Sequence, residues 1–234
     1  MAPTAVVSGA NSGIANAFVT VLLQEGYNVF AVDRNQGDAL HSLEKAGAHT
    51  SVLDVTSQES ITAFKTSQLK DEPLDLLLNI AGVASGSEVD SLEKSTLDIF
   101  EKTFAVNTYG PFFLTQALLP NLQAASKAKI GIVSSRVGSI GDNSSGGHYA
   151  YRSSKAAVNS IGKSLAMNLK DQGITVLLLH PGYVQSNLLP NAKMPPDTVQ
   201  PKEAAEKLWR NVVKVKDIEQ TGTFWHREGF ELPW

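Results

Sequence analysis

Tyr151 and Lys155 are the two residues of this sequence whose types and spacing point most directly to chemistry. The run around them is predicted to be helical, because it is rich in alanine and carries apolar residues at Val158, Ile161 and Leu165, so both side chains would share one helix face. A phenol titrates near pH ~10, and a neighbouring ammonium favours its phenolate, so the pair would exchange protons closer to neutrality. Such a pair suits the reduction of a carbonyl, although the same spacing occurs on many solvated helices.

A glycine-rich turn follows the first predicted strand, in the run Ser8-Gly9-Ala10-Asn11-Ser12-Gly13-Ile14-Ala15. The glycines would let a pyrophosphate approach the backbone, and the positive end of the helix expected from Asn16 to Gln24 would hold its charge. Asp33 ends the second predicted strand, 20 residues after Gly13, where a carboxylate can accept the ribose hydroxyls of a dinucleotide. A turn or helix-capping aspartate is the alternative. The turn and the carboxylate together predict a bound dinucleotide.

The choice between NAD and NADP depends on neighbouring residues of opposite charge. Asp33 would repel a 2′-phosphate and therefore favours NAD, whereas Arg34 could stack on adenine or pair with that phosphate and admit NADP. Ser12 is uncharged, so the glycine turn supplies no further cation for the phosphate. The sequence favours NAD and leaves NADP possible.

The elements that position these residues alternate along the chain. Short β-branched or Leu-rich runs alternate with longer amphipathic stretches, which is typical of βαβ units, and strands that are nearly all apolar indicate a parallel sheet covered by helices on both faces. We therefore expect an α/β fold, a doubly wound Rossmann-type domain with a parallel sheet of about seven strands flanked by helices. The predicted strands are Ala5 to Ser8, Val29 to Asp33, Ser51 to Leu53, Leu74 to Leu78, Ile130 to Ser134, Thr175 to His180 and Thr223 to Trp225.

Bulk properties narrow the possible classes of protein. The chain has 234 residues without a composition shift, which predicts a single domain over residues 1–234. A net charge of −3 without a long basic run argues against nucleic acid or membrane partners. The chain shows no bilayer-spanning run and no leader, so we expect a cytoplasmic protein. It contains no cysteine, and its five histidines lack ligand spacing, so we predict no metal site.

Beyond the glycine turn and the Tyr151–Lys155 pair, further motifs follow in order: Asn79-Ile80-Ala81-Gly82, Val106-Asn107-Thr108-Tyr109-Gly110, Ser134-Ser135-Arg136-Val137-Gly138 and Pro181-Gly182. Over nearly its whole length the sequence resembles the short-chain dehydrogenase/reductase family. Tyr149-Ala150-Tyr151-Arg152 and the ending Glu231-Leu232-Pro233-Trp234 are similar to the C-factor and sniffer group of carbonyl reductases.

This resemblance implies a role for each matched residue. Tyr151 would be the general acid or base, and Lys155 would lower its proton affinity and hold the nicotinamide ribose. Ser135 would polarise the substrate carbonyl, and Asn107 would position a water linked to Lys155. The implied cofactor contacts are Gly9, Asn11, Ser12, Gly13, Ile14, Asp33, Arg34, Asp54, Val55, Asn79, Ala81, Gly82, Tyr151, Lys155, Pro181, Gly182 and Val184.

Three of these residues also have structural interpretations. Ser135 could be a strand-end hydroxyl, Asn107 a helix-kink residue before Pro111, and Asp54 a helix-entry carboxylate.

The sequence departs from the family pattern at a few positions. Ser8 stands for Thr and keeps the hydroxyl, Ala15 stands for the third glycine, and Ile80 stands for the second Asn, which removes one side-chain hydrogen bond. The interval from Ser135 to Tyr151 is longer than usual, and we expect its surplus, Gly141 to His148, to border the substrate.

The walls of the substrate site are predicted to be mostly apolar, with Arg136, Val137, His148 and Tyr183 as contacts. Ala84 to Ser87, Arg136 to Ile140 and a proline-bearing loop or lid between Ser186 and Gln200, with Leu188, Leu189 and Met194, complete the walls. A hydrophobic ketone, aldehyde or secondary alcohol fits such walls better than a sugar, although Arg136 leaves room for one anionic group.

Two other functions remain open from the sequence. One is an NAD(P)-binding sensor or signalling protein, and the other is a reductase-like enzyme that acts on an imine in secondary metabolism. The helices after Leu97 and Tyr149 carry small and apolar residues on more than one face, which favours a homodimer or homotetramer.

Overall fold

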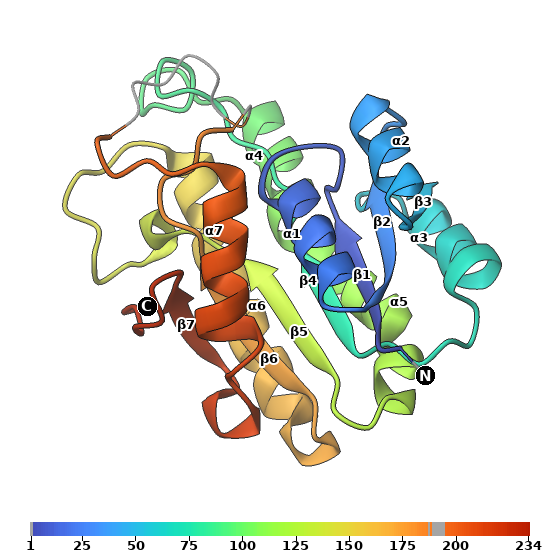
Figure 1. The fold of residues 1–234 in the computed structure, drawn as a ribbon. Helices are drawn as coiled ribbons and strands as arrows, with labels where there is room; N and C mark the ends of the chain where they lie inside the picture. Colours follow the sequence, from blue (N-terminus) through green and yellow to red (C-terminus); the bar gives the residue numbers. More distant parts are fainter. Residues whose placement is uncertain (1, 187, 189–194) are drawn as a thin grey trace.

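A seven-stranded parallel sheet forms the centre of the computed structural model, which describes residues 2–186, 188 and 195–234 (Figure 1). The strands lie in the order β3-β2-β1-β4-β5-β6-β7. Their bounds are β1 Thr4–Ser8, β2 Asn28–Asp33, β3 His49–Val52, β4 Leu76–Asn79, β5 Lys129–Val133, β6 Thr175–His180 and β7 Thr223–His226. The order reverses direction at β1, which pairs with β2 on one side and β4 on the other. A crevice at the carboxyl ends of the strands is expected at such a reversal.

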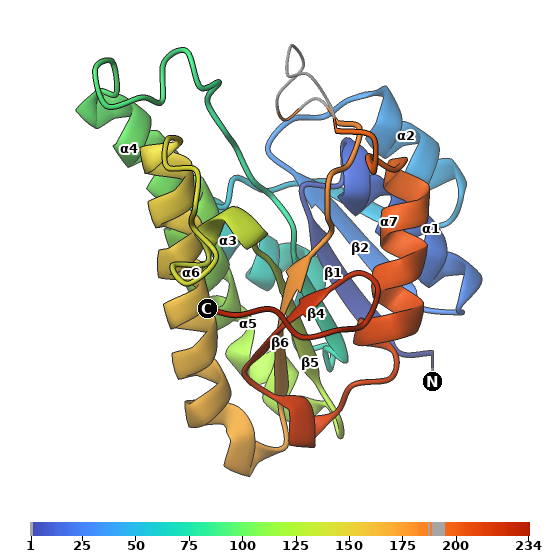
Figure 2. The same ribbon diagram turned by 90° about the vertical axis from the view of Figure 1, so that its left-hand side faces the viewer.

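Helices cover both faces of the sheet, as Figure 2 shows. Their bounds are α1 Gly13–Gln24, α2 Asp38–Lys45, α3 Gln58–Phe64, α4 Leu97–Phe104, α5 Gly110–Ala124, α6 Tyr149–Leu169 and α7 Pro201–Leu208. One apolar core includes Phe18, Leu40 and Leu208 and lies under α1, α2 and α7. The other includes Leu114 and Val158 and lies under α3, α5 and α6. Burial on both faces explains why the central strands are almost entirely apolar.

The structure confirms the predicted fold class and shifts several element bounds by one to three residues. The strand expected from Ser51 begins at His49, because its register is set by pairing with β2. The strand expected from Leu74 begins at Leu76, since the Leu74 N–H donates to the Asn121 carbonyl of α5 instead of joining the ladder. The helix expected from Asn16 already begins at Gly13.

A π-helical turn, Ala105–Tyr109, joins α4 to α5. Pro111 lies two residues after this turn and has no N–H, so the regular helical bond to the Asn107 carbonyl is missing. Asn107 lies within this widened turn, in agreement with the interpretation of Asn107 as a helix-kink residue.

The end of the segment between β6 and α7 lies beside the beginning of the same segment. Val184 and Val199 form a parallel bridge, and the Gln185 N–H donates to the Val199 carbonyl. The expected lid residues Leu189 and Met194 lie outside the described residues. Within the described part of the chain, no helix has the length and apolar character needed to cross a membrane.

Candidate active site

A cavity of about 360 Å³ opens at the carboxyl ends of the central strands. The predicted cofactor contacts that line it are Gly9, Ser12, Gly13, Ile14, Asp33, Arg34, Asp54, Val55, Ala81, Gly82, Tyr151, Lys155, Pro181, Gly182 and Val184. Ser135 also lines it. These residues come from most of the length of the sequence, and the fold brings them to one edge of the sheet.

The glycine turn leaves its end of the cavity open to a ligand. Gly9 has φ +81°, and a Cβ atom there would lie 2.9 Å from the Cα of Ala81. Ser12 precedes α1 in extended backbone and makes no side-chain cap, so the first amides of the helix keep their donors free of a side-chain partner. Free amides at the positive end of a helix bind phosphate groups well. The residues present therefore fit the pyrophosphate of a dinucleotide.

The hydroxyl of Ser8 joins the glycine turn to the end of β4. It accepts the N–H groups of Ile80 and Ala81 at 3.1 Å and 3.3 Å and donates to the Leu78 carbonyl at 3.4 Å. The replacement of the family threonine by Ser8 thus keeps the group that makes these contacts.

The Asp33 carboxylate is held beside the glycine turn by two backbone amides. It accepts the N–H of Asn11 at 3.1 Å and that of Asn35 at 3.2 Å. Arg34 lines the same end of the cavity. Asn11 itself is not a lining residue, because its side-chain amide points to the Asn35 carbonyl at 3.3 Å.

Asn79 is the other predicted cofactor contact that does not line the cavity. Its side chain is buried and donates to the Thr115 hydroxyl at 3.2 Å, so it ties β4 to α5 beneath the cavity. Asp54 does line the cavity, and it also accepts the N–H and hydroxyl of Thr56 at 2.9 Å and 2.7 Å. The Asp54 carboxylate thus stabilises the turn before α3, whereas the hydroxyl of Ser57 caps that helix.

Tyr151 and Lys155 meet Ser135 inside the cavity. The Lys155 ammonium lies 5.9 Å from the centre of the Tyr151 ring and donates to the Val133 carbonyl at 2.8 Å. Burial raises the pKa of Tyr151, and the nearby Ser135 hydroxyl has a smaller effect that lowers it. Burial lowers the pKa of Lys155 to about 8.

The pKa of Tyr151 therefore moves in the opposite direction from the one that the Tyr–Lys spacing predicts. We expected the ammonium to favour the phenolate, whereas desolvation disfavours that anion more strongly. The phenol consequently stays protonated at neutral pH, which is the form that can donate a proton.

Asn107 is buried and does not itself line the cavity. Its side-chain oxygen accepts the Val83 N–H at 2.9 Å, and its amide donates to the Val83 carbonyl at 2.9 Å and to the Ser154 hydroxyl at 3.1 Å. Asn107 thus fixes Val83, which lines the cavity, to the helix that carries Tyr151.

The four predicted substrate contacts, Arg136, Val137, His148 and Tyr183, are not lining residues of the cavity. Arg136 is turned away because its guanidinium pairs with Asp142 in the loop beyond it. Tyr183 is exposed, and His148 precedes α6 with φ +50°. The positions that sequence reasoning assigned to the substrate therefore lie around the described cavity rather than in its walls.

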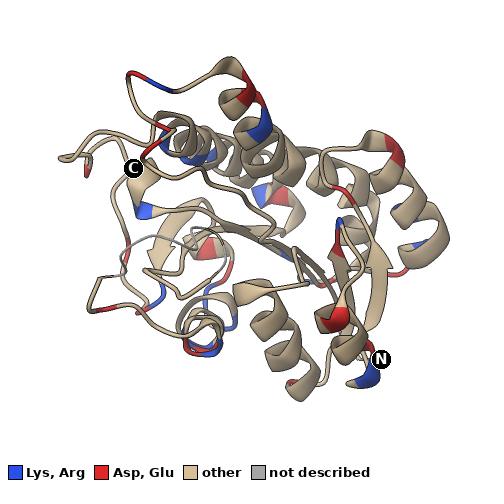
Figure 3. Ribbon diagram, turned by 90° about the horizontal axis from the view of Figure 1, so that it is seen from above, with Lys and Arg blue, Asp and Glu red and all other residues tan. Residues whose placement is uncertain are grey.

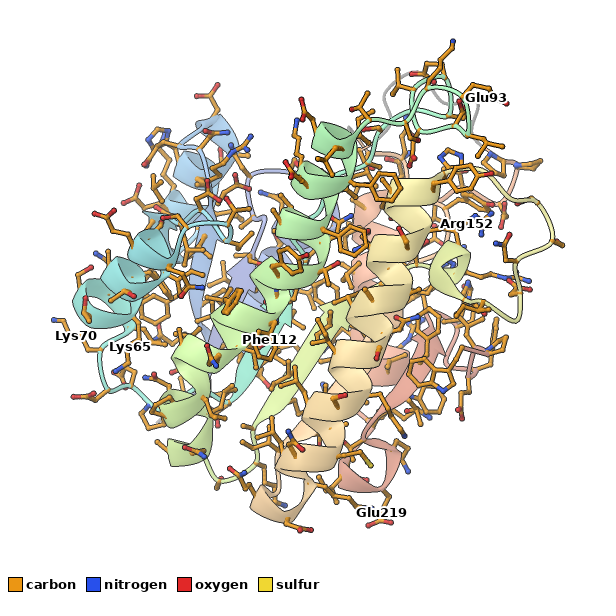
Figure 4. All side chains as sticks on the ribbon, turned by 180° about the vertical axis from the view of Figure 1, so that it is seen from behind. Lys65, Lys70, Glu93, Phe112, Arg152 and Glu219 are labelled. Atoms are coloured by element: carbon orange, nitrogen blue, oxygen red, sulfur yellow. The ribbon has the colours of Figure 1, made fainter. Side chains whose placement is uncertain are left out.

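The inserted loop from Gly141 to His148 is fastened by Arg152, a residue to which the sequence analysis assigned no role. Its guanidinium donates to the Ser145 hydroxyl at 2.7 Å, to the Val137 carbonyl at 2.8 Å, and to the carbonyls of Gly146 and Gly147. Figure 4 shows Arg152 near the N-terminal end of α6. Its place directly after Tyr151 is the only signal of this role in the sequence.

Two more polar residues at this site carry no recognisable signal in the sequence. His180 lines the cavity, and its Nδ1 accepts the Arg136 N–H at 3.2 Å. Burial lowers the pKa of His180 to about 3, so the ring is neutral. Arg227 is buried and donates to the carbonyls of Pro181 and Asp197 at 2.7 Å and 3.3 Å, which holds both ends of the segment after β6.

Comparisons with known proteins agree with this geometry. A family model described as short chain dehydrogenase matches residues 3–197. A 1-hydroxy-2-glutathionyl-2-methyl-3-butene dehydrogenase of Rhodococcus sp. (strain AD45) is 38% identical over 235 residues, covering 99% of each chain. C-signal of Myxococcus xanthus is 36% identical over 171 residues, covering 69% of this chain and 93% of that protein.

Solved structures give the same picture. An NADPH-bound carbonyl reductase from chicken fatty liver superimposes with a TM-score of 0.91 at 31% identity, covering 100% of this chain and 99% of that one. The carbonyl reductase Sniffer of D. melanogaster superimposes with a TM-score of 0.89 at 27% identity, covering 100% of each chain.

Proposed function

The chain belongs to the short-chain dehydrogenase/reductase family of NAD(P)-dependent oxidoreductases, and from this premise we propose that it interconverts a hydrophobic carbonyl compound and the corresponding alcohol. Tyr151 acts as the general acid or base in this proposal. The observation that carries it is the meeting of the Tyr151 phenol, the Ser135 hydroxyl and the Lys155 ammonium in a cavity that also contains the glycine turn.

Each of these side chains has a step to perform. Ser135 donates a hydrogen bond to the carbonyl oxygen of the substrate and so stabilises the negative charge that develops there. Tyr151, protonated because burial raises the pKa of its phenol, gives its proton to that oxygen. Lys155 lies close enough to stabilise the resulting phenolate. The nicotinamide, when bound, supplies or accepts the hydride.

The amides of the first turn of α1 would hold the pyrophosphate, and Asp33 would accept the adenosine ribose hydroxyls. The sequence favours NAD, but the comparisons do not support that preference. A similar carbonyl reductase is NADPH-bound, and Arg34 lines the cavity beside Asp33. We propose that the site accepts either cofactor and that Arg34 pairs with the 2′-phosphate of NADP.

Titration of the protein with NADH and NADPH tests this assignment. Arg34→Ala is expected to weaken the binding of NADPH about ten-fold and to leave the binding of NADH nearly unchanged. Only NADPH has the 2′-phosphate with which the Arg34 guanidinium would pair. Equal losses for both cofactors would contradict a specific contact between Arg34 and the 2′-phosphate.

The reaction itself is tested by a screen of apolar ketones, aldehydes and alcohols, followed through absorbance at the reduced nicotinamide band. Beside these apolar compounds we test 1-hydroxy-2-glutathionyl-2-methyl-3-butene, a charged glutathione conjugate, since a relative at 38% identity is named as its dehydrogenase. Tyr151→Phe removes one hydroxyl, so we expect turnover to fall by a factor of at least about a thousand while cofactor binding persists. Undiminished turnover in Tyr151→Phe would rule out the assigned proton donor.

A sensor or signalling protein is the second candidate function, and the similarity to C-signal favours it. It differs from the first candidate in one measurable respect. Tight cofactor binding without turnover of any carbonyl or alcohol would support the sensor.

A further inference from the structure

Asp90 is a buried carboxylate in the segment between β4 and α4, and it is only 1% exposed. No step of the proposed reaction uses it. A buried carboxylate is costly unless hydrogen bonds replace its lost hydration. The partners of this group therefore indicate what it does.

The partners of Asp90 lie mainly in the first turn of α6. One carboxylate oxygen accepts the Ala150 N–H at 2.9 Å, and the other accepts the Tyr151 N–H at 3.1 Å. The first oxygen also accepts the Ser95 hydroxyl at 3.1 Å, and the Asp90 carbonyl accepts the His148 N–H at 3.1 Å.

Asp90 acts as the N-terminal cap of α6, because the residues at the start of the helix provide no side-chain cap. His148 stands before the helix with φ +50° and forms no side-chain cap, and the first turn contains no acidic residue. A carboxylate at this end satisfies two unpaired amides and interacts favourably with the positive end of the helix. Asp90 supplies it from about 60 residues earlier in the chain.

The same segment is tied to α6 at a second point. Val83, near its start, is held by Asn107, whose amide also donates to Ser154 at 3.1 Å. Figure 2 shows α4 beside the N-terminal part of α6, with the segment before α4 above them. Hydrogen bonds therefore connect this segment to α6 at Ala150 and Tyr151 and again at Ser154.

We propose that Asp90 is a positioning residue that fixes Tyr151 relative to Ser135 by binding the backbone amide of Tyr151 itself. This inference rests on the proposed function, because it assigns the position of the phenol a part in turnover. A small displacement of a reacting group lowers the rate of the chemical step far more than it weakens substrate binding.

Asp90→Asn tests the proposal with a nearly isosteric side chain. It removes the charge and turns an amide N–H toward one of the two helix donors. We expect kcat to fall about ten-fold, whereas KM and the Kd for NADPH stay within about two-fold of the wild-type values. Ser95→Ala is the matched control, because it removes a partner of the same carboxylate that is not part of α6. That variant should keep kcat.

Amide hydrogen exchange gives a readout that does not depend on turnover. In Asp90→Asn the amides of Ala150 and Tyr151 should exchange faster, and those from Asn159 to Leu169 should not change. A wild-type kcat in Asp90→Asn overturns the proposal even if the melting temperature falls, since the carboxylate would then only stabilise the helix. Should Asp90→Asn fail to fold, Asp90→Ser, a smaller neutral acceptor, is measured in the same way.

Failure of the proposed function has a different signature from failure of this inference. A wild-type protein without turnover on any carbonyl or alcohol contradicts the proposed function, and unchanged exchange at Ala150 and Tyr151 in Asp90→Asn contradicts the cap.

Discussion

Lys155 carries a charge in an environment that disfavours it. The residue is 4% exposed, and the bond that its ammonium makes within the described structure goes to the Val133 carbonyl. One neutral acceptor replaces only part of the hydration of an ammonium, so burial lowers the pKa of Lys155 from 10.5 to about 8. A bound nicotinamide ribose, which the family resemblance places on this residue, would add further hydrogen bonds to the ammonium.

The lowered pKa predicts how stability depends on pH. Below about 8 the ammonium is protonated in both states, whereas between about 8 and 10.5 the unfolded chain binds more protons than the folded one. The free energy of unfolding should therefore rise through this window, by at most about 1.4 kcal/mol per pH unit from this group. Lys155→Met should lack that rise.

Urea denaturation of both proteins, below pH 8 and within the window, measures the difference. Contributions of other buried amines, such as Lys129, whose pKa burial also lowers, cancel because both proteins contain them. If the free energy of unfolding changes with pH in the same way in both proteins, the fold does not lower the pKa of Lys155.

The turn between β1 and α1 depends on backbone that only glycine tolerates. Gly9 has φ +81° and faces the backbone of Ala81, whereas Gly26, after α1, has φ +83° and no heavy atom within 4 Å of the place that a Cβ atom would take. The two positions therefore share the conformational requirement and differ only in the space around them.

Gly9→Ala and Gly26→Ala separate these two effects. Gly26→Ala should lose on the order of 1 kcal/mol of stability, because an L residue is strained at positive φ. Gly9→Ala should lose more, because its methyl group also meets the backbone of Ala81. Gly9→Ala should in addition weaken cofactor binding at least about ten-fold, since its methyl group displaces either the turn or the end of β4. Cofactor titration and urea denaturation of both variants provide the comparison, and equal cofactor affinities would contradict the role of the turn.

Lys and Arg residues are interspersed with Asp and Glu residues along the chain, as the ribbon in Figure 3 shows from above. Several exposed apolar side chains lie on helices of one face of the sheet. Leu97, Phe113 and Met167 are 71%, 37% and 51% exposed and belong to α4, α5 and α6, which cover the same face of the sheet. The expectation that these helices bind a second copy of the chain stays a prediction.

We predict a homodimer or homotetramer in solution. Phe113→Glu should shift light scattering toward the monomer mass, because a buried carboxylate at an interface is costly. Val215→Glu changes a residue that is 59% exposed and follows α7, so it serves as the control that leaves the mass unchanged. A wild-type protein that scatters as a monomer contradicts the prediction.

Local pattern in the sequence was enough to predict the parallel α/β architecture, the glycine turn with Asp33, and the meeting of Tyr151 with Lys155. These features depend on periodicity and on spacings of a few residues, and helix and strand geometry translate both directly into positions. The carboxyl ends of parallel strands then bring the motifs together whatever their separation along the chain.

Only the tertiary structure decided which partners the buried polar side chains bind. Asn79 binds α5 instead of facing the cavity, and Asp90 caps the helix of Tyr151. A buried donor or acceptor takes whichever partner packing brings within reach, and no periodicity records that choice. The pKa of Tyr151 is raised for the same reason, because the extent of burial depends on the packed structure and not on the spacing to Lys155.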